Sequence, residues 1–247
     1  MTRVAPVVPA QSDLLCEFCG YTLNGLPEAS NCPECGHPIT ASLHSTRKPP
    51  RWESATAGKV LRAFLATSGE VIVRPTRFYR TTTARGDVDE ARKFGLVHWW
   101  IASILFGLAG AMHAGLFYRG VGPPVVTYLT TGVVGAVALS CTAYVALVAT
   151  TWAANKLTAW EAAYRGIRLP IDVVRRSMYY HAAHYFPVGL LAVVTVAGYR
   201  LLLARDVFAA SSVLPYLYVL CAEVVLAAGY LFHTYWIGMR NMMYANR

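Results

Sequence analysis

The chain has 247 residues, of which 14% are charged and 55% hydrophobic, and its formal net charge is +9. Soluble domains usually carry roughly 25% charged residues, so this composition excludes an ordinary soluble globular protein. The positive charge would suit nucleic acid or anionic lipid as a partner, and its placement along the chain decides between them.

The chain contains six cysteines and does not begin with the pattern of a secretory signal peptide. The first twelve residues include Arg3 but no apolar core of about 7 to 15 residues. Four cysteines are paired in sequence, and the other two, Cys141 and Cys221, lie in apolar segments. This usage fits metal-bound thiolates in a reducing cytoplasm better than a disulfide framework.

The paired cysteines, Cys16–Cys19 and Cys32–Cys35, form two Cys-x-x-Cys units, each followed directly by glycine. Two intervening residues let both thiolates reach one tetrahedral ion, and the glycine permits the positive-φ turn that directs backbone N–H groups at sulfur. The units are separated by 12 residues, which is typical of a zinc ribbon. We therefore predict a small β head over residues 1–45 that holds one structural Zn²⁺ through four ligands: Cys16, Cys19, Cys32 and Cys35.

So short a head cannot bury a core, so the ion has to supply the folding free energy, about 10 kcal/mol or more. Iron in a rubredoxin-like site and redox thiols are the alternatives, although the loop between the pairs is too short for the rubredoxin core. Residues 4–46 contain no Lys or Arg, and phosphate binding needs cations. We therefore expect no nucleic-acid binding, and a structural or protein-docking module with an unknown protein partner instead.

Residues 46–93 form a basic linker to the membrane part. From Arg51 to Lys93 there are nine basic and five acidic residues. Its apolar residues fall on one helical face: Val60, Leu61, Phe64, Leu65 and Ile72. This pattern predicts an amphipathic helix in the lipid headgroup region, and packing against the inner end of the bundle is the alternative.

Residues 94–247 contain apolar segments long enough to cross the hydrocarbon core, which takes about 20 residues. A basic stretch in the middle carries a second apolar face, which predicts another surface-lying helix: Ile171, Val174, Met178, Ala182 and Tyr185. We predict an all-α membrane fold, a four-helix bundle of two hairpins, with helices at about 94–118, 125–154, 187–208 and 213–238.

The charges of the loops predict the orientation, because basic loops stay on the cytoplasmic side. The linker and the middle stretch are strongly basic, whereas the other two loops offer only Arg119 in one and Arg200 and Arg205 in the other. We therefore predict a multi-pass protein of the cytoplasmic (inner) membrane with both termini in the cytoplasm. Membrane lipid is then one of its partners.

Small residues recur along the first two predicted helices, at Ser103, Gly107, Ala111 and Gly115 and at Gly132, Ala136 and Ser140. Such stripes let helix backbones approach closely in lipid. We expect the two helices to pack along them within the chain, and a homodimer through the same stripes is the alternative.

Ionisable residues inside the membrane segments are candidates for chemistry. Glu223 is predicted near mid-bilayer, where a charged group is costly, and a hydrogen-bonded neutral carboxyl is the alternative to a proton or ion site. Several histidines are predicted near the inner boundary and could hold a metal or haem, among them His98, His184 and His233. No H-E-x-x-H, phosphate loop or G-x-S-x-G motif is present, so we expect no enzyme.

Two stretches carry a family resemblance. Residues 74–78 before the first apolar hairpin, and residues 179–187 at the entry to the second half, resemble a Yip-type domain over about 170 residues. Residues 16–27 resemble the Cys-x-x-Cys-Gly-Tyr-x-Leu-x-Gly-Leu-Pro ribbon at the front of various bacterial integral membrane proteins. The Yip-like resemblance implies a non-enzymatic membrane protein that recruits partners, although that family typically has five spans.

These features together predict an integral membrane protein with a cytosolic zinc ribbon that acts as a scaffold or adaptor in membrane organisation or protein recruitment. The alternative is a small transporter, or a haem- or metal-binding redox protein, that uses Glu223 and the inner histidines.

Overall fold

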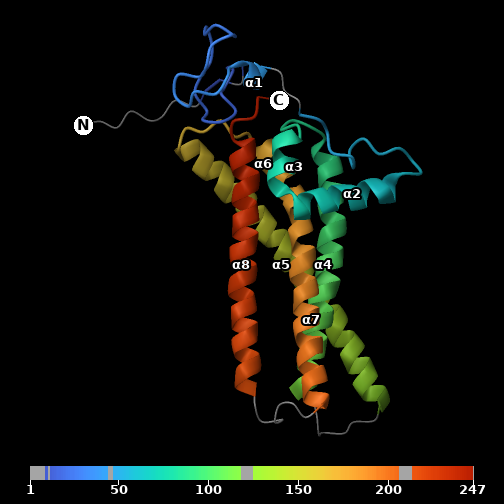
Figure 1. The fold of residues 1–247 in the computed structure, drawn as a ribbon. Helices are drawn as coiled ribbons and strands as arrows, with labels where there is room; N and C mark the ends of the chain where they lie inside the picture. Colours follow the sequence, from blue (N-terminus) through green and yellow to red (C-terminus); the bar gives the residue numbers. More distant parts are fainter. Residues whose placement is uncertain (1–8, 11, 44–46, 118–124, 206–212, 247) are drawn as a thin grey trace. The chain divides into compact units, whose positions relative to one another are not determined.

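The computed structural model describes residues 9, 10, 12–43, 47–117, 125–205 and 213–246, and over these residues the regular elements are all helical. Only isolated bridges join extended segments there: Leu15 with Thr22, Asn31 with Pro38, and Lys48 with Thr82. The helices in chain order (Figure 1) are α1 (Thr40–Leu43), α2 (Val60–Val73), α3 (Pro75–Thr81), α4 (Val88–Phe117), α5 (Val125–Tyr164), α6 (Ile171–His181), the 3₁₀ turn η1 (Ala182–His184), α7 (Tyr185–Ala204) and α8 (Val213–Met242).

The chain divides into two compact units. One, which we call the head unit, comprises the described residues of Met1–Gly95, Thr151–His181 and Thr234–Arg247. The other, the span unit, comprises those of Leu96–Thr150 and Ala182–His233. Helices α4, α5 and α8 contribute residues to both units.

Within the described residues, four helical segments are long and apolar enough to cross a membrane: Val88–Gly115, Gly132–Tyr164, Ile171–Ala204 and Leu214–Met242. This confirms the prediction of four apolar helices long enough to span a membrane. In the first, 44% of the most apolar window is buried inside the protein, against 0%, 11% and 6% in the other three. The first span is therefore the most enclosed of the four, and the others present most of their surface outward, as lipid-facing helices do.

Within the span unit, α4 contacts both α5 and α7. A Cβ on Gly107 would collide with the Ser140 side chain and come within 2.7 Å of the Ala136 carbonyl, so α4 and α5 pack here along their small-residue stripes. A Cβ on Gly189 would lie 3.0 Å from that of Leu105, which places α7 against α4, as Figure 1 also shows. These contacts confirm the expected packing of the first two helices within the chain.

The helices run further than their apolar segments, because polar residues cap them outside the apolar stretch. Helix α4 begins at Val88 rather than at residue 94, and Asp87 Oδ1 accepts the N–H groups of Asp89 and Glu90 at 2.8 and 3.1 Å. Helix α5 continues ten residues beyond Ala154. It ends at Tyr164 in a Schellman motif, in which Gly166 has a φ of +70° and the Ile167 N–H donates to the Ala162 carbonyl.

The second predicted surface helix is instead buried inside the head unit. On α6, the predicted apolar face is buried at Val174 and Met178, and the opposite residues Arg176 and Tyr180 are buried too. Helix α6 stops before η1 because Pro187 has no N–H for the carbonyl of residue 183, where a continuous helix would need one.

Helix α2 packs against the rest of the head unit, which fits the second alternative for the linker helix, and its location in the headgroup region stays a prediction. Its Ala63, Thr67 and Val71 are buried in the head unit, and Phe64 packs on Phe94 with ring centroids 5.3 Å apart. The opposite side exposes apolar side chains to the surroundings. The helix ends at Arg74 because a residue before proline disfavours the α conformation, and Pro75 then opens α3.

Candidate metal centre

Each Cys-x-x-Cys pair forms a tight turn with the same backbone pattern. The N–H of Gly20 donates to the Cys16 carbonyl at 2.8 Å, and the N–H of Gly36 donates to the Cys32 carbonyl at 2.9 Å. Both glycines have positive φ, +83° and +74°, as their positions after the pairs predict. The glycines therefore close two matching knuckles.

The knuckles bring the four sulfur atoms together. All four lie within 4.8 Å of one another, and they form the one potential metal-holding cluster of three or more Cys, His, Asp or Glu side chains within the described residues. The Sγ atoms of Cys16 and Cys35 are 3.5 Å apart, and those of Cys19 and Cys32 are 3.6 Å apart. Tetrahedral Zn–S bonds of about 2.3 Å require sulfur separations of about 3.8 Å. The cluster therefore fits one tetrahedral ion, and all four cysteines are free of disulfides.

Backbone N–H groups surround the sulfurs. The Tyr21 N–H donates a hydrogen bond to the Cys19 sulfur, and the His37 N–H donates one to the Cys35 sulfur. The Cys32 sulfur accepts from the N–H groups of Glu34 and Cys35. Burial acts to raise the pKa of the Cys32 thiol, but donation from two backbone N–H groups and from neighbouring thiols lowers it to about 7. Burial raises the pKa of the Cys19 thiol in the absence of an ion. The donors stabilise thiolate, the form that binds metal.

A small apolar core lies beneath the sulfurs, built from equivalent residues of the two knuckles. Leu23 and Ile39 each follow the first cysteine of their knuckle by seven residues, and both are buried with Cys16 and Cys32. The bridge of Leu15 with Thr22 recurs 16 residues later as that of Asn31 with Pro38. The head is thus a pseudo-twofold pair of knuckles around the cluster, a repeat that the cysteine spacing alone did not reveal.

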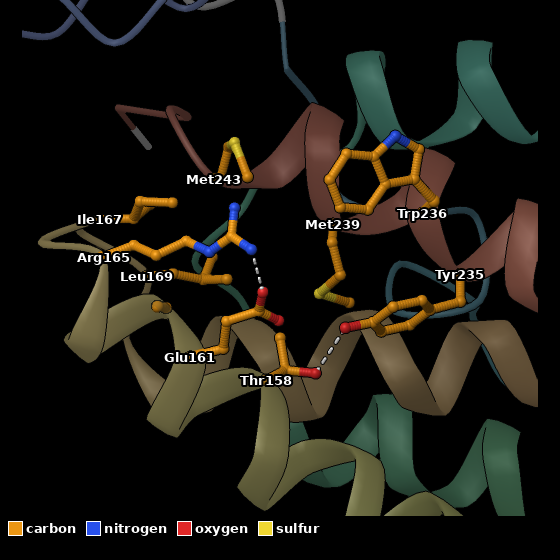
Figure 2. Close-up of a pocket in the computed structure, with 10 residues that line it drawn as sticks. Thr158, Glu161, Arg165, Ile167, Leu169, Tyr235, Trp236, Met239 and Met243 are labelled. Carbon is orange, nitrogen blue, oxygen red and sulfur yellow. Dashed lines mark hydrogen bonds and ion pairs between the residues drawn. The ribbon is translucent and has the colours of Figure 1, made fainter.

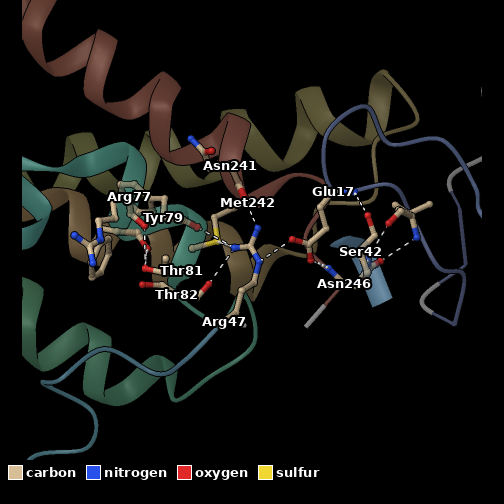
Figure 3. A network of polar contacts seen from close by, with 12 residues as sticks. Glu17, Ser42, Arg47, Arg77, Tyr79, Thr81, Thr82, Asn241, Met242 and Asn246 are labelled. Carbon is tan, nitrogen blue, oxygen red and sulfur yellow. Dashed lines mark hydrogen bonds and ion pairs between the residues drawn. The ribbon is translucent and has the colours of Figure 1, made fainter. Parts of the chain in front are cut away.

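The C-terminal segment holds the head in place within the head unit. Asn246 donates through Nδ2 to the carbonyls of Leu15 and Ser42 at 2.8 and 3.2 Å. Its Oδ1 accepts the Leu15 N–H at 2.9 Å, and its own N–H donates to Glu17 at 3.2 Å. One side chain near the end of the sequence therefore pairs with backbone on both sides of the cysteine region, as Figure 3 shows in part.

Arg47 joins the same network from the linker. Its Nε donates to Glu17 at 3.1 Å, and its side chain is 4% exposed. Its two terminal nitrogens donate to the carbonyls of Tyr79, Thr82 and Asn241 at 2.9 to 3.1 Å (Figure 3). This arginine thus connects the head to α3 and α8, and neither the burial of its side chain nor its pairing with Glu17 was evident from the sequence.

The predicted intramembrane residues do not gather around one point as a metal cluster in the part of the chain that the structure describes. His98 and His184 are buried in the span unit, where His184 Nδ1 lies 2.7 Å from the Tyr230 hydroxyl. His233 is exposed. One carboxylate oxygen of Glu223 is buried and has no hydrogen-bond partner among the described residues. Sequence reasoning missed His113, whose Nδ1 lies 2.6 Å from the Tyr216 hydroxyl.

A second buried polar group also escaped the sequence reasoning. Arg176 donates through Nε to Glu53 at 2.9 Å and through Nη1 to the Thr83 carbonyl, and its Nη2 forms an ion pair with the same carboxylate at 2.7 Å. The Tyr180 hydroxyl donates to the same carboxylate at 2.6 Å. The Arg176 and Glu53 side chains are 2% and 5% exposed, and this closed pair leaves no room for a ligand.

Figure 2 shows a crevice between the end of α5 and α8 within the head unit. The Thr158 and Tyr235 hydroxyls are 2.7 Å apart there, and Arg165 pairs with Glu161 at 2.7 Å. The crevice has a volume of about 40 Å³, enough for a few water molecules at most. The crevice is therefore too small for a substrate.

Comparison with known proteins identifies no relative. No protein-family model matches the chain, and neither a curated protein nor a solved structure matches it. The resemblance to a Yip-type domain therefore stays a prediction, and function has to be argued from the site.

Proposed function

We propose that this protein is a non-enzymatic membrane scaffold whose cytosolic zinc-ribbon head presents a rigid surface to a protein partner. The observation that carries the proposal is the four-sulfur cluster, whose geometry suits one structural ion and leaves no open coordination position. Catalytic zinc sites keep a position for water or substrate, and a Cys₄ site does not. A structural role for the ion follows.

The hydrogen bonds that hold the head against the rest of the head unit support the proposal that the head presents a surface to a partner. Asn246 and Arg47 hold the head through hydrogen bonds that the metal ligands themselves do not make. The metal site alone would not require these contacts. A partner that binds a head held in this way loses little conformational freedom, because the surface is already ordered.

The surface that the head presents to a partner is aromatic and acidic. Phe18 and Tyr21 are 42% and 39% exposed on the first knuckle, and the Phe18 ring stacks on His37 of the second at 3.8 Å. Glu28 and Glu34 are on the same head, and Glu28 is exposed. Exposed aromatic residues are frequent anchors in protein interfaces, and the acidic residues select for a basic partner surface.

Replacing one ligand tests the structural role of the ion. We expect Cys16→Ser to lose the bound zinc and unfold the head, because the ion contributes about 10 kcal/mol or more to its folding. The four spans should still insert. Elemental analysis should find one zinc per chain in the unchanged protein and in Cys141→Ser, an exposed cysteine outside the cluster, and limited proteolysis should cut the head only in Cys16→Ser. Stoichiometric zinc in Cys16→Ser would refute the proposal.

A second candidate function is proton or ion transport, favoured by the buried carboxylate oxygen of Glu223 that has no partner among the described residues. A transporter of this kind would show proton-coupled flux in vesicles that Glu223→Gln abolishes. A redox protein that used the histidines would instead show a Soret band or more than one metal ion per chain. Colourless protein without flux and with one zinc leaves the scaffold as the function.

A further inference from the structure

The head unit contains a hollow that is separate from the metal centre. It lies between the segment Lys48–Arg51 and the ends of α2 and α3, and its volume is about 490 Å³. This is within the range of about 300–1,000 Å³ typical of small-molecule sites. The charged residues that line it are Lys48, Arg51, Arg74, Arg77 and Glu70.

Most of the positive charge in this hollow is not neutralised. Arg51 pairs with Glu70 at 3.4 Å, but both side chains are largely exposed, so the pair is weak. Across the part of the chain that the structure describes, no carboxylate pairs with Lys48, Arg74 or Arg77. The hollow is therefore lined by four cations and one carboxylate, which leaves an excess of three positive charges. Such an excess attracts a polyanion.

The backbone of this hollow is fixed before any ligand binds. The Lys48 N–H donates to the Thr81 carbonyl at 2.7 Å, and the Lys48 carbonyl accepts the Thr83 N–H at 3.1 Å. Pro49 and Pro50 then restrict the chain, and Phe78 closes the floor as a buried side chain. Binding would therefore require little ordering of the backbone.

Helix α2, whose end lines the hollow, also carries a short apolar stripe. Leu61 and Leu65 share one helical face and are 71% and 60% exposed, and Val73, at the last position of the helix, is 73% exposed. Val73 directly precedes Arg74, one of the cations of the hollow. An exposed apolar face with cations at its end is typical of a helix that lies in the headgroup layer and places its apolar side chains among acyl chains.

We propose that the hollow binds the phosphate group of an anionic phospholipid, with Arg74, Arg77 and Lys48 as its ligands. Arginine suits this chemistry because its planar guanidinium donates two parallel hydrogen bonds to phosphate oxygens. A soluble phosphate compound offers the same group, but it would leave the apolar stripe of α2 uncovered. The site shares no residue with the metal centre, so the proposal stands or falls independently of the proposed scaffold function.

The test uses the full chain in nanodiscs of phosphatidylcholine, titrated with dioctanoyl phosphatidylglycerol and followed by native mass spectrometry. We expect saturable binding of one lipid. The variant Arg74→Gln/Arg77→Gln should weaken it about tenfold or more, because it removes two cations that donate charge-assisted hydrogen bonds to the phosphate. The matched variant Arg62→Gln/Arg92→Gln removes the same charge from exposed positions of the same unit outside the hollow and should weaken it less than about twofold.

Other outcomes contradict the proposal. Equal weakening in the two double variants would mean attraction by net charge and no site, and absence of saturable lipid binding would exclude the site. Inorganic phosphate or glycerol phosphate that displaces the lipid at lower concentration than the lipid itself binds would assign the hollow to a soluble anion. The variant Lys48→Gln gives an independent readout if the arginine variant loses its zinc or its folded head: weaker lipid binding in it supports the site, and unchanged lipid affinity contradicts it.

Discussion

Two arginines in the head unit are buried and paired, although the sequence suggests solvated cations at both positions. Arg47 meets Glu17, 30 residues away, and Arg176 meets Glu53, 123 residues away. Both carboxylates accept a second donor, from Asn246 and Tyr180 respectively. Buried charges of this kind are tolerated only when each is paired and hydrogen-bonded.

The pair of Arg176 and Glu53 gives a prediction for stability. Arg176→Met leaves the Glu53 carboxylate buried without its cation, which should lower the free energy of unfolding by about 3–5 kcal/mol. Arg176→Met/Glu53→Leu removes both charges and should recover much of that loss. Chemical unfolding of the detergent-solubilised protein, followed by tryptophan fluorescence, measures the difference.

The neighbouring Arg175 is the control for this prediction. It pairs with Asp172 at 3.4 Å, but the two side chains are 43% and 67% exposed. Arg175→Gln should therefore change the free energy of unfolding by less than about 1 kcal/mol. Equal destabilisation by Arg175→Gln and Arg176→Met would show that the buried pair has no special role.

At the scale of single residues, the sequence identifies metal ligands better than it identifies buried ion pairs. The cysteines share a spacing of three and a following glycine, so local geometry alone predicts that their sulfurs meet. Arg176 and Glu53 carry no such mark, because their contact depends on how distant segments pack.

At the scale of helices, hydropathy predicts the spans but not where they end. The predicted segment 94–118 corresponds to α4, which starts six residues earlier, and 125–154 corresponds to α5, which ends ten residues later. The turns of α4 and α5 that lie outside the predicted segments contain polar residues, so a search for apolar segments does not include them. Asp87 and Gly166 are the signals that mark the true ends, an N-cap and a positive-φ C-cap.

Helix packing in the span unit gives a second prediction. Gly107→Val should separate α4 from α5, because its side chain would meet Ser140 and the Ala136 carbonyl, and overpacking of this kind costs about 1–3 kcal/mol. Gly132→Val on the other stripe is the control, since a Cβ there meets nothing within 4 Å. The thermal unfolding temperature of the purified protein should fall for Gly107→Val alone.

The same pair of variants addresses the homodimer, which stays a prediction. Because Gly132 faces open space in the chain, a dimer through the α5 stripe would form there. Loss of a dimer in Gly132→Val with unchanged thermal stability would support that interface. A fall in stability for Gly132→Val equal to that for Gly107→Val would contradict the packing of α4 on α5 within one chain.

At the scale of the whole molecule, the four spans and the cysteine cluster follow from sequence, and the closure of the head unit by its C-terminal segment does not. Leu15 and Asn246 are 231 residues apart, and Asn246 looks like an ordinary terminal residue. A Cβ on Gly20 would collide with the Tyr244 ring, so this glycine serves both its turn and the approach of the C-terminal segment. The close approach of Tyr244 to Gly20 is evident only from the folded structure.

Orientation is the prediction that concerns the molecule as a whole. The stretch after the second predicted span, residues 125–154, holds Lys156, Arg165 and Arg168, whereas the loop after the first predicted span holds only Arg119. Basic loops stay in the cytoplasm, so we expect Ala163→Cys to be protected from a membrane-impermeant maleimide in intact cells and Gly122→Cys to react. Replacing Cys141 and Cys221 by alanine removes the cysteines outside the cluster. Permeabilised cells should label both positions, and reaction of Ala163→Cys in intact cells would invert the topology and place the metal-binding head outside the cytoplasm.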